Sequence, residues 1–179
     1  FRDAIERDAA GRAASVLDDI AFVEEREEMV DHLIALHQQG RIPERITHND
    51  TKINNVMIDN VSGQGICIMD LDTVMPGFAL YDFGDLVRTT TISCAEDEQD
   101  LSRVQMRLPL YKALVEGYLS SAGEFLTQDE KEHLAFSGKL VTFTIGMRFL
   151  TDHLNGPTSR RIAKTTILIG SVSVSYTHL

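Results

Sequence analysis

Two short apolar runs near the middle of the chain give its clearest hydrophobic pattern. Val56-Met57-Ile58 and Ile66-Cys67-Ile68-Met69 are apolar and partly β-branched, and turn-forming residues lie between them: Asn60, Ser62, Gly63 and Gly65. Two such runs joined by turn formers predict a β-hairpin. A polar stretch from His48 to Asn55 precedes the hairpin, and Asp70 ends it. We therefore expect the hairpin to bring Asp70 back beside the polar stretch.

Helical patterns precede this region. Residues 1–17 are rich in Ala and Arg, which favour helix. Apolar residues then recur at helical spacing from about Ile20 to His37, and Asp18 or Asp19 could cap that helix. We expect one continuous helix to about Gln39, ended by Gly40 and Pro43.

Helical patterns also follow the hairpin. Asp82 is expected to begin a helix that runs to about Thr90, and Pro109 suits the first turn of a helix that ends near Gly123. Thr127 and Glu130 have capping-box spacing, which predicts the start of a long helix towards Leu154. The whole pattern predicts an α+β fold that is mostly helical and has one small hairpin.

Composition narrows the class of protein. The 179 residues suffice for one domain with a core, and 43% hydrophobic with 25% charged residues is typical of a soluble globular protein. The net charge of −10 disfavours nucleic acid as a partner. Cys67 and Cys94 form no disulfide framework, and neither a membrane-spanning run nor a secretory signal is evident. We expect a cytoplasmic protein that does not bind membranes.

The polar stretch before the hairpin carries the candidate chemistry. His48, Asp50, Lys52 and Asn55 have the spacing His-x-Asp-x-Lys-x-x-Asn, which is typical of a protein-kinase catalytic loop. Asp70 follows Asp50 by twenty residues and ends a hydrophobic strand, where a kinase has its metal-binding aspartate. Two carboxylates and an amide that converge suit a divalent cation with a phosphate chain, and a base directed at a hydroxyl.

Each candidate residue has an expected role. Asp50 is the candidate base, and a loop aspartate in an Asx turn is its structural alternative. Lys52 would lie near the transferred phosphate, or it is an ordinary surface lysine. Asn55 and Asp70 would bind Mg²⁺ and, through it, the phosphates of ATP. His48 is expected to support the loop and not to take part in the chemistry.

Three further aspartates and an arginine are weaker candidates. Asp72 could share a metal with Asp70 or only hold the loop, and we expect a supporting role. Asp82-Phe83-Gly84 spells the metal-binding tripeptide of kinases, but it begins a helix after the hairpin, so Asp82 is interpreted as a cap or a support for the loop. Arg148 and Asp152 could face an acceptor pocket, although exposed helix charges are the preferred interpretation.

Taken together, these motifs resemble those of the aminoglycoside phosphotransferase-like kinases. The resemblance covers about residues 1–156 and is carried by three segments: His48–Asn55, Ile68–Asp72 and Tyr81–Asp85. It is nearest to the N-acetylhexosamine 1-kinase branch. The resemblance implies the C-terminal lobe of a protein-kinase-like fold, use of ATP and Mg²⁺, and a structural role for Asp82. It also implies a small-molecule hydroxyl acceptor, such as an N-acetylhexosamine. An aminoglycoside, choline or amino-alcohol kinase and a non-catalytic interaction domain are the alternatives.

The two ends of the chain differ from that family. A complete kinase of this kind has an N-terminal lobe with a β-sheet over the nucleotide, whereas residues 1–40 have helical patterns. We therefore expect a C-terminal lobe that is inactive without the missing lobe of the same protein. Residues 157–179 no longer resemble the family. We expect a non-native tail there, and a divergent but real segment is the alternative.

Overall fold

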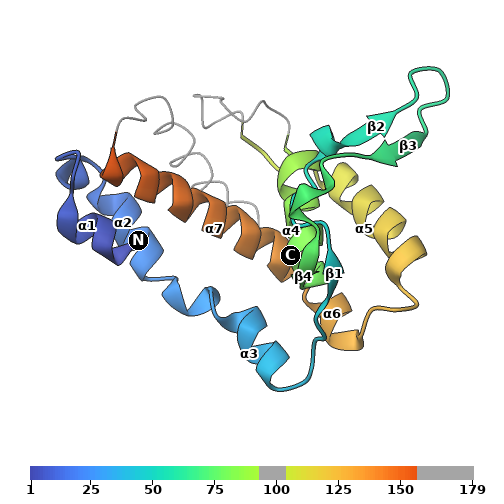
Figure 1. The fold of residues 1–179 in the computed structure, drawn as a ribbon, viewed down its shortest axis with the longest axis horizontal. Coiled ribbons are helices and arrows are strands. Elements are labelled where there is room, and N and C mark those ends of the chain that lie inside the picture. Colours follow the sequence, from blue (N-terminus) through green and yellow to red (C-terminus); the bar gives the residue numbers. More distant parts are fainter. Residues whose placement is uncertain (93–103, 157–179) are drawn as a thin grey trace. The chain divides into compact units, whose positions relative to one another are not determined.

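The fold comes from a computed structural model that describes residues 1–92 and 104–156 (Figure 1). These residues divide into two compact units. Of the described residues, the first unit contains 1–32, 92, 104–106 and 142–156, and the second contains 33–91 and 107–141. The expectation for the tail at 157–179 lies outside the described residues. No helix in the described ranges is both long and apolar enough to cross a membrane.

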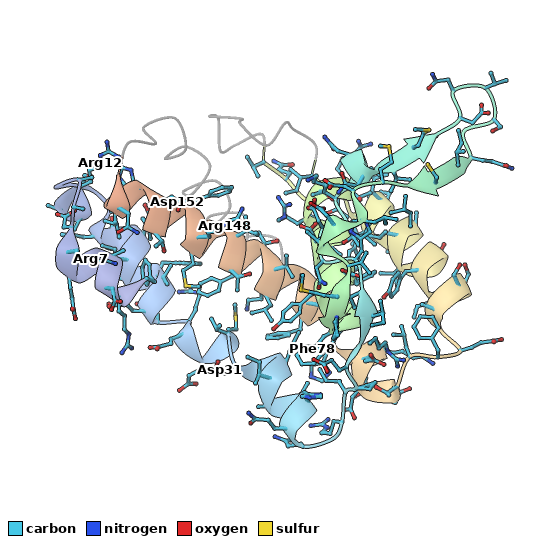
Figure 2. All side chains as sticks on the ribbon, in the orientation of Figure 1. Arg7, Arg12, Asp31, Phe78, Arg148 and Asp152 are labelled. Atoms are coloured by element: carbon cyan, nitrogen blue, oxygen red, sulfur yellow. The ribbon has the colours of Figure 1, made fainter. Side chains whose placement is uncertain are left out.

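The first unit is helical. It contains α1 (Arg2–Arg7), η1 (Ala13–Ser15), α2 (Leu17–Glu24), η2 (Glu27–Met29) and the later part of α7 (Leu134–Asn155). Its core consists of buried apolar residues from these elements: Ala4, Val16, Ile20, Val23, Phe143, Leu150 and Leu154. Arg12 donates hydrogen bonds to the carbonyls of His153 and Gly156, at 3.2 and 3.1 Å, beside the end of α7 (Figure 2). These bonds satisfy carbonyls that a helix C-terminus leaves without partners.

The second unit combines helices with two small antiparallel ladders. Its elements in chain order are α3 (His32–Gln38), β1 (Arg45–Thr47), η3 (Ile53–Asn55), β2 (Val56–Ile58), β3 (Gly65–Ile68), η4 (Leu71–Thr73), β4 (Met75–Gly77), α4 (Ala79–Thr90), α5 (Leu108–Ala122), α6 (Gln128–Glu132) and the first part of α7. Strand β1 pairs with β4, and β2 pairs with β3. The hairpin β2–β3 projects beyond α4 (Figure 1).

Helix α4 is the element around which the second unit packs. It contacts α5, β1 and η3, and its apolar face is buried through residues such as Phe83 and Val87. The ring of Phe83 lies 4.8 Å from that of Tyr118 on α5. Phe78, the residue before α4, stacks on Tyr81 at 5.6 Å (Figure 2). The contact of the buried Phe83 with Tyr118 packs α4 against α5.

The local sequence signals were largely correct. The predicted hairpin is confirmed as β2 and β3, and the fold is α+β and mostly helical. The capping box of Thr127 and Glu130 is confirmed, with both reciprocal hydrogen bonds formed. Pro109 lies in the first turn of α5, as predicted.

Three helix boundaries were predicted wrongly. The stretch 18–39 is not one helix but α2, η2 and α3, because its apolar residues serve two cores: Ile20 and Val23 belong to the first unit, Leu33 and Leu36 to the second. The helix expected from Thr127 breaks at His133. Helix α4 begins at Ala79 and not at Asp82, since the apolar positions Ala79 and Leu80 are already buried against the unit.

Gly84 allows α4 and α7 to approach closely, and this yields a prediction about stability. A Cβ at Gly84 would lie 2.5 Å from both the carbonyl oxygen of Ser137 and a methyl of Val141. We expect Gly84→Ala to lower the free energy of unfolding by about 1–3 kcal/mol through overpacking. Gly117→Ala is the matched control, since nothing lies within 4 Å of that position in α5. It should raise stability by about 0.5–1 kcal/mol. Urea denaturation measures both, and a Gly84→Ala variant as stable as the wild type would contradict the packing.

Candidate active site

The polar loop from His48 to Ile53 is held along α4 by hydrogen bonds. The two carboxylate oxygens of Asp82 accept from the backbone N–H groups of His48, at 2.8 Å, and Asn49, at 2.7 Å. A carboxylate in the first turn of a helix is also favoured by the helix dipole. Further along, the Thr51 hydroxyl donates to the Asp82 carbonyl at 2.6 Å, and the Ile53 N–H donates to the Thr89 hydroxyl at 3.2 Å. The loop therefore follows the helix over its whole length.

Asp50 lies at the centre of this loop. Its Oδ2 accepts hydrogen bonds from Lys52 Nζ, at 2.6 Å, and from Asn55 Nδ2, at 2.9 Å. Burial raises the pKa of Asp50, but the hydrogen bonds from Lys52 and Asn55 outweigh it and hold that pKa below its ordinary value. Its Oδ1 has no hydrogen-bond partner among residues 1–92 and 104–156. Asp50 is thus an ionised carboxylate with one oxygen available to an outside donor.

Asn55 connects Asp50 to the end of the hairpin. It is 7% exposed, and its Nδ2 donates to the carbonyl of Asp50 at 2.8 Å as well as to the side chain. Because the amide nitrogen is engaged with Asp50, the amide oxygen points away from that residue. The Asn55 carbonyl accepts from the Met69 N–H at 2.8 Å, which brings the next residue, Asp70, beside the loop. The backbone bond therefore places the end of β3, and with it Asp70, next to Asn55.

Asp70 and Asp72 form a pair of carboxylates just after β3. Asp70 has a left-handed backbone, with φ of 63°, which few residues other than glycine adopt and which aspartate tolerates better than most. Asp72 belongs to η4. A side-chain hydrogen bond with Asp72, and then the negative charge of Asp72, raise the pKa of Asp70, while the cation of Lys52 lowers it. A divalent cation would offset this repulsion between the two carboxylates.

The donors at this point fit a magnesium ion better than a protein-only metal centre. Nowhere in the described part of the chain do three His, Cys, Asp or Glu side chains converge as a metal-binding group. Mg²⁺ usually takes one or two carboxylates from the protein and completes its octahedron with water and substrate phosphates. Asp70, Asp72 and the amide oxygen of Asn55 offer hard oxygen ligands of that kind.

His48 supports the loop from both of its ring nitrogens. Nε2 lies 3.0 Å from the Met69 carbonyl, and Nδ1 lies 3.3 Å from the Asp50 N–H. This pattern fits the tautomer that carries its proton on Nε2. His48 therefore links Asp50 to Met69, the residue that precedes Asp70.

The sequence did not single out two residues of this network. The Thr73 hydroxyl donates to the His48 carbonyl at 2.6 Å, and the side chain of Asn49 bonds to backbone carbonyls after Asp72. Every residue has a backbone carbonyl, so hydrogen bonds to carbonyls produce no recognisable spacing of residue types in the sequence. The one available signal was an asparagine between His48 and Asp50, since asparagine tolerates the positive φ of 63° found there.

The structure thus separates the predicted residues into groups. Asp50, Lys52, Asn55, Asp70 and Asp72 form the first group: Lys52 and Asn55 donate to Asp50, and the charges of Lys52 and Asp50 act on Asp70, which is paired with Asp72. Asp82 and His48 support the loop. Arg148 and Asp152 lie on the part of α7 that belongs to the first unit (Figure 2), and Arg148 is exposed. The first group can orient a hydroxyl at Asp50 and bind a cation with phosphate at Asp70.

One comparison with known proteins bears on this site. A model of the phosphotransferase enzyme family (APH) matches residues 1–123, well over half of the chain. The matched range contains the loop, the hairpin and α4, and therefore every residue of the candidate site.

The hydrogen bonds that the loop donates to the Asp82 carboxylate lead to a prediction about stability. Asp82→Ala leaves the N–H groups of His48 and Asn49 without their charged acceptor, which should lower the free energy of unfolding by about 2–4 kcal/mol. Asp31→Ala is the control, because Asp31 is exposed and should change stability by less than about 0.5 kcal/mol. Chemical denaturation of both variants provides the measurement. Equal stability of the two would show that Asp82 does not hold the loop.

Proposed function

Because the chain belongs to the phosphotransferase enzyme family, we propose that its loop at residues 48–55 transfers a phosphoryl group from ATP to a hydroxyl of a small molecule. The observation that carries this proposal is the position of Asp50. Its Oδ2 accepts hydrogen bonds from Lys52 and Asn55, and the carboxylates of the candidate metal site follow shortly after β3. Its Oδ1 has no partner in the part of the chain that the structure describes, so it can accept from a hydroxyl. A base beside a cation–phosphate site is what phosphoryl transfer to an alcohol requires.

Asp50 acts in this proposal mainly by orienting the acceptor. Its lowered pKa makes it a weak base but keeps it ionised at neutral pH. A weak base suits a loose transition state, in which the hydroxyl proton leaves late and position matters most. The hydroxyl would donate to Oδ1 and pass its proton there as the new O–P bond forms and the bond to ADP breaks.

Asn55 and Asp70 would hold Mg²⁺ through their side-chain oxygens. When bound, Mg²⁺ neutralises charge on the nucleotide phosphates and fixes their direction. The chain's own contribution is to bring the two ligands together through the hydrogen bond from the Met69 N–H to the Asn55 carbonyl. Asp72 supports Asp70 in this account.

Lys52 would balance charge around the transferred phosphoryl group. Its hydrogen bond to Asp50 raises the pKa of Lys52, so that the ammonium stays charged. The charges of Asp50 and Asp70 act on it in the same direction. A fixed cation between the base and the metal ligands lowers the free energy of a transition state that is rich in negative charge.

The identity of the acceptor rests on the resemblance alone. We propose an N-acetylhexosamine phosphorylated at its anomeric hydroxyl, and hence a role in carbohydrate metabolism in the cytoplasm. Neither nucleic acid nor membrane enters this proposal as a partner. Aminoglycosides, choline and amino alcohols are the other acceptors to test. A non-catalytic interaction domain is less favoured, because it would not need Asp50, Asn55 and Asp70 in register.

We extend the proposal to a separate nucleotide-covering lobe, which the resemblance implies. Large apolar side chains of the segment 46–75 are exposed to solvent, among them Ile46 (74%), Ile66 (59%), Ile68 (60%) and Leu71 (61%). Soluble proteins rarely leave many large apolar side chains of one segment exposed. Their exposure supports a covering lobe and a nucleotide over the hairpin.

The activity prediction compares the protein that contains this lobe with two variants. Asp50→Asn should lower kcat by about 10²–10⁴-fold, the usual contribution of a general base, with little effect on folding. Asp70→Ala should abolish metal-dependent turnover. Asp59→Asn is the control, because asparagine can keep the turn that Asp59 caps through the N–H groups of Val61 and Ser62. A coupled ADP-release assay over sugars and amino alcohols measures all three. Wild-type turnover by Asp50→Asn would overturn the assignment of the base.

The same assay separates an enzyme from a binding domain. The 179-residue chain alone should turn over negligibly, because positioning of the nucleotide supplies most of the catalysis. The protein with its covering lobe should phosphorylate an acceptor in the panel. If it is inactive on every acceptor, the non-catalytic alternative is favoured.

A further inference from the structure

We propose that Asn49 is a positioning residue of this site, whose side-chain amide fixes the metal-ligand segment, residues 70–73, against the loop that carries Asp50. The proposal deepens the proposed function and rests on it. Asn49 lies one residue before Asp50, and its own backbone N–H is bound by Asp82 at 2.7 Å. A group that hydrogen-bonds to the Asn49 side chain is therefore held at a fixed position relative to Asp50, the candidate base.

The side chain of Asn49 bonds mainly to the segment after Asp72. Its Nδ2 lies 3.1 Å from the carbonyl of Thr73, with longer contacts to the carbonyls of Met75, at 3.4 Å, and Thr47, at 3.3 Å. Its Oδ1 accepts from the Thr47 hydroxyl at 3.0 Å, which fixes the orientation of the amide. The shortest of these donor bonds reaches the residue that follows Asp72.

Two further hydrogen bonds attach the segment to His48, one on each side of Asp70. The Thr73 hydroxyl donates to the His48 carbonyl at 2.6 Å, and the His48 Nε2 lies 3.0 Å from the Met69 carbonyl. The segment from Met69 to Thr73 is thus attached to the dipeptide His48-Asn49 at each end. The residues between these two ends are Asp70, Leu71 and Asp72.

The backbone conformation at Asn49 does not by itself require an asparagine, which points to a role for its side chain. Its φ of 63° suits glycine best, so glycine would serve if only the backbone mattered. Strand β4 instead leaves room for the amide: a Cβ at Gly77 would lie 2.9 Å from Asn49 Oδ1 and 2.5 Å from the Thr47 hydroxyl. The site therefore accommodates a side chain at residue 49 that the backbone does not require.

Burial does little to hold the metal-ligand segment in place. Asp70, Leu71 and Asp72 are all exposed to solvent. Without burial, the direction of such a segment depends on its hydrogen bonds. Loss of the Asn49 amide should then loosen the ligands while the packed helices stay folded.

The first arm of the test follows backbone amide hydrogen exchange in the 179-residue chain without metal. Asn49→Gly keeps the backbone conformation and removes the amide, so exchange of residues 70–75 should accelerate about threefold to tenfold, as expected for one lost hydrogen bond. Exchange in α5 should not change. Asn60→Gly makes the same chemical change in the exposed turn of the hairpin and should leave residues 70–75 as in the wild type.

The second arm titrates the chain with Mn²⁺ and follows paramagnetic broadening of the Asn55 side-chain amide and the Asp70 and Asp72 backbone amides. Asn49→Gly should need about threefold to tenfold more Mn²⁺ for half-maximal broadening, and Asn60→Gly should not. Should Asn49→Gly fail to fold, Asn49→Asp replaces it, since it keeps the shape and lacks the amide donors. The same shifts are expected from it.

The outcomes separate this inference from the proposed function. Unchanged exchange, or unchanged Mn²⁺ affinity, in Asn49→Gly would overturn the positioning role and leave residue 49 with a backbone role only. If the wild-type chain shows no broadening by Mn²⁺, the metal site of the proposed function fails. In that case the exchange rates alone decide whether Asn49 holds the segment.

Discussion

The site depends on the pair of hydrogen bonds that the backbone N–H groups of His48 and Asn49 donate to the Asp82 carboxylate. Asp82 lies in the first turn of α4, a helix fixed by its buried apolar face. Because the carboxylate binds two successive backbone groups, it sets both the position and the direction of the loop. Asp50 follows immediately, and the segment that carries Asp70 is attached to the same dipeptide. The packing of α4 therefore determines where the polar groups of the site lie.

The sequence predicted those parts that depend on local signals. The hairpin, the capping box at Thr127 and the proline in α5 each follow from a few adjacent residues, and the structure has all three. In the loop from His48 to Asn55, Lys52 and Asn55 both donate to Asp50, and the roles that the spacing suggests for them stay predictions. The break between α2 and α3 could not be predicted, because it depends on which of two cores buries each apolar residue. The bonds of Asn49 and Thr73 to backbone carbonyls were missed for a related reason: any residue supplies a carbonyl.

The candidate site is exposed to solvent, which agrees with a function that needs a bound nucleotide and metal. Asp70 and Asp72 are exposed, and β3 is exposed along its length. A structural metal centre would need more protein ligands than the described residues supply. A magnesium–nucleotide site needs fewer, because phosphates and water complete the coordination. In the proposed function, the exposed carboxylates and apolar residues are the surface onto which the nucleotide is placed.

The most direct test of the account is a crystal structure of the protein with Mn²⁺ and a non-hydrolysable ATP analogue. An anomalous difference map locates the metal without reference to the rest of the structure. The account predicts a peak at about 2.0–2.6 Å from side-chain oxygens of Asp70 and Asn55, with Asp50 close to the terminal phosphate. A metal bound at Asp82, with Asp70 outside its coordination sphere, would contradict it.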